Sequence, residues 1–130
     1  MPSDWPVRVY YEDTDAGGVV YHASYLCYLE RARTEWLRAL GYSQARLKQE
    51  ESLVFTVVGM RLDFLRPARL DDLLRVRSRV KLSGGASVEF DQEILRDSER
   101  ILAANVRVAC LDAASFRPRR LPAALRGSLE

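Results

Sequence analysis

Two segments of alternating polar and apolar residues constrain the fold most strongly, because they can pair in only one register. Residues 75–82 and 88–94 each alternate in this way, and the sequence Ser83-Gly84-Gly85-Ala86-Ser87 separates them. A three-residue hairpin loop at 84–86 places apolar residues opposite apolar residues. A two-residue loop would instead place charged residues opposite apolar ones. The sequence therefore predicts an antiparallel hairpin with three facing charge pairs: Lys81 with Glu89, Arg79 with Asp91, and Arg77 with Glu93.

Three further segments are predicted to be strands. Residues 7–10 are short and β-branched, and residues 53–64 are apolar or alternating. Pro67 should end the latter strand because proline cannot donate to the ladder. Residues 101–111 form the last strand, with Ala104, Val106, Val108 and Cys110 on one face. The expected order is strand, loop, long helix and then four strands in meander-like succession.

The long helix is predicted over residues 24–40. Its apolar positions recur at spacings of four and three residues, namely Tyr25, Leu29, Ala32, Trp36 and Leu40. Gly41 stands where a left-handed C-terminal cap is expected, and a short helix over 43–50 has Ser43 as its N-cap. One long helix on an antiparallel sheet is an α+β arrangement.

Composition limits what this domain can bind. At 130 residues, the chain is expected to form a single domain (1–130) with mobile termini at 1–5 and 123–130. A net charge of +2 gives no bulk electrostatic case for nucleic acid or an anionic membrane surface. No apolar segment approaches the roughly 20 residues of a membrane span, and no signal peptide is evident, so the predicted location is cytoplasmic.

Two other features favour structural roles over functional ones. The basic residues of segment 75–82 could bind phosphate, but acids on the facing strand would neutralise three of them, which favours a solvated sheet face. Cys27 and Cys110 lie within apolar patterns and share no metal or redox spacing, so both are expected to be buried reduced thiols.

The candidate chemistry lies in residues 10–25. This stretch holds three acids, the pair Gly17-Gly18 and the only histidine of the chain, directly before the predicted helix. Taken alone, Asp13 and Asp15 could be turn formers and His22 a surface residue. The Asp-Thr-Asp trio lacks the ligand pattern of a calcium loop, so no metal is predicted.

This stretch resembles the signature of hot-dog-fold acyl-CoA thioesterases of the 4-hydroxybenzoyl-CoA thioesterase family, and most closely their Tol–Pal-associated branch. The matching segments cover 11–15, 17–22, Tyr25, 30–37, 66–72 and 117–122. The resemblance implies a long central helix wrapped by a curved antiparallel sheet of about five strands. It also implies homodimers or homotetramers with active sites at the dimer interface, Asp15 as the catalytic residue, and Tyr11 and His22 as further site residues.

The residue chemistry agrees with thioester hydrolysis. A carboxylate such as Asp15 can attack the thioester directly, giving a mixed anhydride, or deprotonate a water molecule. Backbone N–H groups at the helix start near His22 can polarise the carbonyl. No serine nucleophile elbow or Cys–His signature is present, and no cofactor is required.

The predicted function is therefore hydrolysis of acyl-CoA to free acid and CoA. Three matters stay open. They are the identity of the acyl group, whether the thiol is CoA or acyl carrier protein, and whether Asp15 acts as nucleophile or as general base. One alternative is a hot-dog hydratase or dehydratase on acyl thioesters, with His22 as its only candidate histidine. The other is a non-catalytic acyl-CoA-binding module of the same fold.

Overall fold

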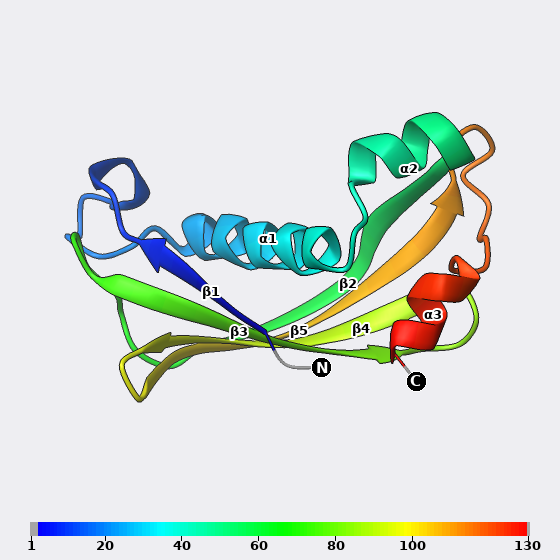
Figure 1. Ribbon diagram of the computed structural model, residues 1–130. Helices are drawn as coiled ribbons and strands as arrows, with labels where there is room; N and C mark the ends of the chain where they lie inside the picture. The colour runs from blue at the N-terminus through cyan, green and yellow to red at the C-terminus, as the bar shows by residue number, and fades with distance from the viewer. Residues whose placement is uncertain (1–2, 130) are drawn as a thin grey trace.

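A five-stranded antiparallel sheet curves around one long helix in the computed structural model, which describes residues 3–129 (Figure 1). The elements in chain order are β1 (Ser3–Arg8), the 3₁₀ helix η1 (Tyr11–Asp13), α1 (His22–Ala39), α2 (Gln44–Glu51), β2 (Leu53–Phe64), β3 (Leu73–Leu82), β4 (Ser87–Arg96), β5 (Glu99–Asp112) and α3 (Ala123–Leu129). Helix α1 lies across the concave face of the sheet. The predicted α+β architecture is confirmed.

The hairpin register is as the alternation predicted. Strands β3 and β4 pair Lys81 with Glu89, Arg79 with Asp91 and Arg77 with Glu93. The Ser83 N–H donates to the Ser87 carbonyl at 3.0 Å and closes the three-residue loop. Gly84 lies there at a φ of +77°, a left-handed conformation that glycine adopts without strain.

The predicted meander is wrong for β2. The strand order is β1-β3-β4-β5-β2, so β2 pairs with β5 and not with β3, the next strand in the sequence. Alternation reports which face of a strand is buried, but it does not report which strand lies alongside. Strands β1 and β2 are therefore the two edges of the sheet.

Both ends of the described chain form regular secondary structure, and their predicted mobility stays a prediction. Strand β1 already begins at Ser3 because it pairs with β3 from Ser78 to Leu73, and its edge position tolerates Pro6. Residues 123–129 form α3, whose Leu125 is buried against the core. Residues 1, 2 and 130, which the prediction of mobile termini also included, lie outside the described residues.

The buried stripe of α1 matches the predicted helix face. Five side chains of this stripe are at most 6% exposed, namely Tyr25, Tyr28, Leu29, Ala32 and Trp36. The Trp36 ring meets Phe90 of β4 edge-on, with the ring centroids 5.3 Å apart. Leu37 is also buried, whereas Leu40 is only partly buried. Helix and sheet thus share one apolar core.

Both predicted helix caps are confirmed. Gly41 has a φ of +93°, and its N–H donates to the Arg38 carbonyl at 2.9 Å. The Ser43 hydroxyl accepts the Arg46 N–H at 3.3 Å at the start of α2. The expectation for Cys27 is wrong, because this thiol is exposed beside the buried stripe, while Cys110 is buried as expected.

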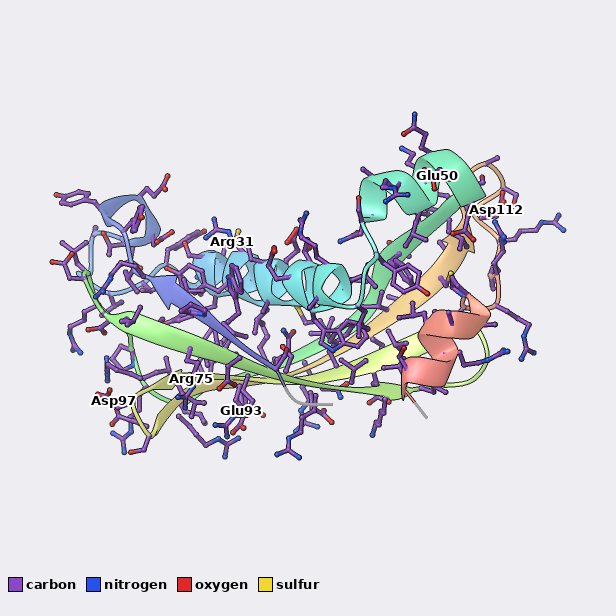
Figure 2. The ribbon with its side chains drawn as sticks, in the orientation of Figure 1. Arg31, Glu50, Arg75, Glu93, Asp97 and Asp112 are labelled. Carbon is purple, nitrogen blue, oxygen red and sulfur yellow. The ribbon has the colours of Figure 1, made fainter. Side chains whose placement is uncertain are left out.

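The outer sheet face is charged but pairs differently from the prediction. Figure 2 shows Arg75 and Glu93 on the side of the sheet away from α1. Of the three predicted ion pairs, only Lys81–Glu89 forms within residues 3–129, at 4.0 Å. Glu93 pairs instead with Arg100 of β5 at 2.7 Å. The acids on β4 lie between β3 and β5. The alternation of the β3–β4 hairpin cannot predict that β5 is the other neighbour of β4.

Candidate active site

Asp15 lies in a closed loop between η1 and α1. Thr14 and Val20 pair across the base of the loop, and the Asp15 N–H donates to the Val19 carbonyl at 3.0 Å. The Gly18 N–H donates to the Asp15 carbonyl at 3.0 Å, and Gly18 has a φ of +80°. A left-handed residue at this point makes the reversal possible, which explains one of the two adjacent glycines.

The Asp15 carboxylate is exposed but oriented. Its Oδ1 accepts the Gly17 N–H at 2.8 Å. A Cβ added to Gly17 would lie 3.1 Å from that oxygen, so a side chain there would crowd the carboxylate. No hydrogen bond to Oδ2 is found within the described part of the chain. One carboxylate oxygen is thus fixed while the other remains available.

The first turn of α1 adjoins this loop. Tyr21 is the N-cap residue, and its carbonyl accepts the Ser24 N–H at 2.8 Å. The backbone N–H groups of His22 and Ala23 have no acceptor among residues 3–129. Unpaired N–H groups at a helix start attract negative charge, and the helix dipole adds to this effect.

His22 stands at the same junction. It is exposed, and its ring lies 4.5 Å from the Tyr21 ring, centroid to centroid. It lines a shallow surface hollow together with Tyr25, Phe64 and Pro67. No hydrogen bond joins its ring to Asp15 in the described structure, so the two predicted residues share a junction without being hydrogen-bonded to each other.

Tyr11 lies apart from them. It opens η1 and is 81% exposed, and its backbone carbonyl accepts the Thr14 hydroxyl at 2.8 Å. Its own hydroxyl makes no hydrogen bond to any described residue. Within residues 3–129 no hydrogen bond joins Tyr11 to Asp15 or His22, and its role stays a prediction.

Tyr25 was expected on the apolar face of the helix and among the residues that match the family signature, but the hydrogen bond of its hydroxyl was not predicted. The buried Oη accepts the N–H of Ala68, 3.1 Å away on the connection between β2 and β3. Burial raises the pKa of Tyr25, and the charges of Asp72 and Asp15 add to this rise. The signal in the sequence was a tyrosine at a buried helix position, since such a hydroxyl needs a partner.

An apolar hollow of about 120 Å³ opens between the second half of α1 and the sheet. Its apolar walls include Trp36, Phe55, Val57, Phe90 and Leu125. Arg33 and Glu30 contribute polar atoms to the same hollow. Burial lowers the pKa of the Arg33 guanidinium, with the Glu30 charge opposing, and this group donates to Gln92 Oε1 at 3.1 Å. The hollow suits an apolar group of limited size.

Residues 3–129 contain neither a metal-binding cluster nor a membrane-spanning helix. No cluster of three or more histidine, cysteine, aspartate or glutamate side chains could hold a metal ion there. None of the described helices combines the length and the apolar character needed to cross a membrane.

Residues 9–129 match the model of the Thioesterase-like superfamily. This chain belongs to that superfamily. The match spans the Asp15 loop, all of α1 and strands β2 to β5. The hot-dog fold predicted from the resemblance is therefore confirmed.

Curated relatives support the same assignment. The chain is 48% identical to the acyl-CoA thioesterase YbgC of Haemophilus influenzae over 118 residues, which cover 91% of this chain and 87% of that one. It is 49% identical to the acyl-CoA thioester hydrolase YbgC of Escherichia coli O6:H1 over 119 residues, covering 91% and 88%. The predicted resemblance to acyl-CoA thioesterases, and with it the prediction of a thioester hydrolase, is confirmed.

Solved structures agree in fold. A probable thioesterase from Bartonella henselae superimposes with a TM-score of 0.89 at 39% identity, over 94% of this chain and all of that one. A 1,4-dihydroxy-2-naphthoyl-CoA thioesterase from Synechocystis gives a TM-score of 0.93 at 22% identity, covering 99% and 96%. At 22% identity the second match bears on the fold alone.

Proposed function

We propose that this protein hydrolyses acyl-CoA thioesters to the free acid and CoA, with Asp15 as the reactive carboxylate. The observation that carries the proposal is the loop geometry. Asp15 Oδ1 is held by the Gly17 N–H at 2.8 Å, its other oxygen is available, and the unpaired N–H groups of His22 and Ala23 begin the adjacent helix. The 48–49% identity to YbgC thioesterases supports the same reaction.

The proposed chemistry uses these groups in order. The thioester carbonyl oxygen lies toward the N–H groups of His22 and Ala23, which stabilise the negative charge that develops on it. Asp15 either attacks the carbonyl carbon or takes a proton from an attacking water. In the first route the C–S bond breaks, CoA leaves as thiolate and takes up a proton, and water cleaves the mixed anhydride. Heavy oxygen from solvent found in Asp15 after one turnover would identify that route.

His22 would orient the substrate or move a proton. Its exposed side chain lines the surface hollow, as Phe64 does. Tyr11 makes no hydrogen bond to the other two residues in the described structure, and its exposed side chain would reach the substrate only from the rim of the site. The proposed order of importance is therefore Asp15, then His22, then Tyr11.

We further propose that two copies join through β2. This edge strand exposes Val57 at 44%, Val58 at 55% and Met60 at 40%, and a long apolar edge invites pairing with another strand. Tyr25 of the first α1 turns packs near Phe64 at one end of β2, and the apolar hollow lies near Phe55 toward the other. Antiparallel pairing of two β2 strands would bring the Asp15 end of one copy toward the hollow of the other. That hollow would then receive the acyl group.

The test is a thioester panel measured for wild type, Asp15→Asn and the control Glu12→Gln. Glu12 is exposed in the same stretch, and its side chain makes no hydrogen bond or ion pair with the described residues. We expect kcat/KM of Asp15→Asn to fall by about 10²–10⁴-fold, the usual range for general acid–base catalysis, and Glu12→Gln to resemble wild type. Circular dichroism would establish that both variants are folded.

Three outcomes would contradict the proposal. One is a folded Asp15→Asn protein that keeps full activity. Another is a wild type that releases no free thiol from any thioester but consumes the absorbance of a 2-enoyl thioester, as a hydratase would. The third is binding of the panel without turnover, which would indicate an acyl-CoA-binding module.

A further inference from the structure

The Asp15 loop is tied to a distant part of the chain at one buried residue. Ala68 has no exposed surface and lies in the connection 65–72 between β2 and β3. Its carbonyl accepts the Val20 N–H at 2.8 Å, and its N–H donates to Tyr25 Oη at 3.1 Å. Val20 closes the Asp15 loop and Tyr25 belongs to the start of α1. The position of Ala68 therefore affects both halves of the proposed site.

Backbone hydrogen bonds hold the two ends of this connection. The N–H groups of Leu65 and Arg66 both donate to the Ile101 carbonyl, at 3.0 and 3.1 Å. At the other end, Asp71 donates to the Val9 carbonyl at 3.1 Å, and Val9 donates to the Asp72 carbonyl at 2.9 Å. The middle of the connection, around Pro67 and Ala68, makes no backbone hydrogen bond to any described strand of the sheet.

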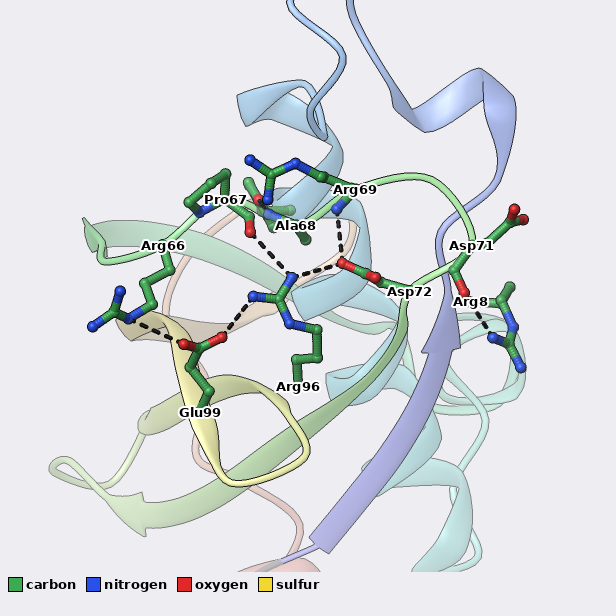
Figure 3. Close-up of polar contacts among 10 residues, drawn as sticks. Arg8, Arg66, Pro67, Ala68, Arg69, Asp71, Asp72, Arg96 and Glu99 are labelled. Atoms are coloured by element: carbon green, nitrogen blue, oxygen red, sulfur yellow. Dashed lines mark hydrogen bonds and ion pairs between the residues drawn. The ribbon is translucent and has the colours of Figure 1, made fainter.

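One side chain supplies that missing link. Arg96, at the end of β4, donates from Nη1 to the Pro67 carbonyl at 3.2 Å and to Asp72 Oδ2 at 2.7 Å (Figure 3). Its Nη2 donates to Glu99 Oε1 at 2.6 Å. Asp72 Oδ2 also accepts the Arg69 N–H at 2.9 Å. The guanidinium thus contacts the connection on both sides of Ala68.

Electrostatics favour this arrangement. The hydrogen bonds that Arg96 donates to Glu99 and Asp72 raise the pKa of its guanidinium, so the group stays charged. Burial would raise the pKa of Asp72, but hydrogen bonds from the Arg69 backbone and from Arg96 outweigh it and lower that pKa. The Arg96 and Asp72 side chains are only 26% and 24% exposed, which limits screening by solvent. Charge-assisted hydrogen bonds of this kind are stronger and more directional than neutral ones.

We propose that Arg96 is a positioning residue for the reaction assigned above: by fixing Pro67 and Asp72, it places Ala68 and so sets the Asp15 loop against the start of α1. The inference rests on the proposed function. Arg96 itself touches neither Asp15 nor His22 in the described structure, so it acts on catalysis only through the connection. Small errors of position matter, because a displacement of about 1 Å can cost about 10²-fold in rate.

The chain offers a matched control in Arg100. This arginine, four residues further on, pairs with Glu93 at 2.7 Å on the outer face of the sheet. Its guanidinium makes no contact with the connection among residues 3–129. Arg100→Ala therefore removes an arginine–carboxylate pair without disturbing Ala68.

The experiment compares Arg96→Ala, Arg96→Lys and Arg100→Ala in three measurements. The first is kcat and KM separately on the best thioester of the panel. The second is hydrogen exchange of the Val20 and Ala68 amides by NMR, which needs no enzyme activity. The third is recovery of kcat in Arg96→Ala on addition of millimolar guanidinium, well below denaturing concentrations.

We expect kcat of Arg96→Ala to fall by about 10- to 100-fold with little change in KM, together with faster exchange of both amides. Arg96→Lys should lie between Arg96→Ala and wild type, since it keeps the charge and one donor group, and it remains informative where Arg96→Ala does not fold. Guanidinium should restore part of the kcat in Arg96→Ala alone. A loss of general stability would not respond in this way.

Opposite results overturn the proposal. Unchanged exchange of Val20 and Ala68 in Arg96→Ala would show that Arg96 does not hold the connection. Faster exchange with full kcat would show that its hold has no catalytic consequence, and an equal fall of kcat in Arg100→Ala would show a general effect of stability. A wild type without thioesterase activity would refute the proposed function instead, while the exchange data would still decide the mechanical link.

Discussion

The two parts of helix α1 are held in different ways. Its middle is apolar, with Tyr28 and Leu29 fully buried and Ala32 at 2% exposure. Its start is polar and largely open, since Tyr21 and His22 are exposed and Tyr25 reaches the connection 65–72 by one hydrogen bond. Burying a leucine side chain stabilises a protein by about 1.5–3 kcal/mol, whereas a hydrogen bond adds about 0.5–1.5 kcal/mol net.

The stability of the fold and the positioning of the Asp15 site therefore depend on different parts of α1. Apolar burial is not directional, so the middle of α1 can hold the fold together without setting the site. Hydrogen bonds are directional, so the few at the helix start can set the geometry around Asp15 at little gain in stability. Variants in the two parts should therefore change different measurements.

Leu29→Ala should give the largest change in stability. The side chain is fully buried and lines none of the hollows described above, so its loss leaves a cavity costing about 2–5 kcal/mol. Activity per folded molecule should stay near wild type. Urea unfolding combined with assays at low temperature would measure both, and Leu29→Met, which conserves volume, should cost less than about 1.5 kcal/mol. A fall in kcat in proportion to the loss of stability would contradict the claim that the middle of α1 stabilises the fold without setting the site.

Tyr25→Phe should have a smaller effect on stability and a visible one on activity. The change removes the acceptor of the Ala68 N–H, and a buried donor left without a partner costs about 1–3 kcal/mol. We expect kcat to fall because Ala68 also holds Val20. Tyr42→Phe is the control, since that hydroxyl makes no hydrogen bond to the described residues. Equal kcat in the two variants would contradict the role given to Tyr25.

Acid pH should give the smallest effect, through Asp72. Its pKa is lower in the folded protein than in the unfolded chain, so its contribution to stability is fully present above the unfolded value of about 4 and is lost as the pH falls through the folded value. The difference in unfolding free energy between wild type and Asp72→Asn should therefore be constant near neutral pH and shrink below about pH 4.

The neighbouring Asp71→Asn variant is the control for this measurement. The Asp71 carboxylate makes no hydrogen bond or ion pair with residues 3–129, and asparagine tolerates its left-handed φ of +74°. Its stability relative to wild type should vary little with pH. A difference for Asp72→Asn that persists unchanged to pH 3 would contradict the ion pair with Arg96.

What the sequence determined is local. Alternation and loop parity set the β3–β4 register, and helical spacing and Gly41 set the buried stripe and the end of α1. The stretch 10–25 supplied Asp15 and His22 as predicted site residues. Each depends on residues close together in the chain, whose side-chain directions follow from the backbone period. The match of residues 9–129 to the superfamily agrees with that local pattern.

Only the tertiary structure decided which distant segments meet. Strand β2 pairs with β5, and Glu93 forms its ion pair with Arg100. Ala68 is hydrogen-bonded to both Val20 and Tyr25, and Arg96 donates to the Pro67 carbonyl next to it. The physical reason is that these contacts join residues 29 or more positions apart, as in Pro67 with Arg96, or link a strand to a second neighbour. Periodicity describes the faces of an element, but a contact between distant elements depends on how the whole sheet is ordered.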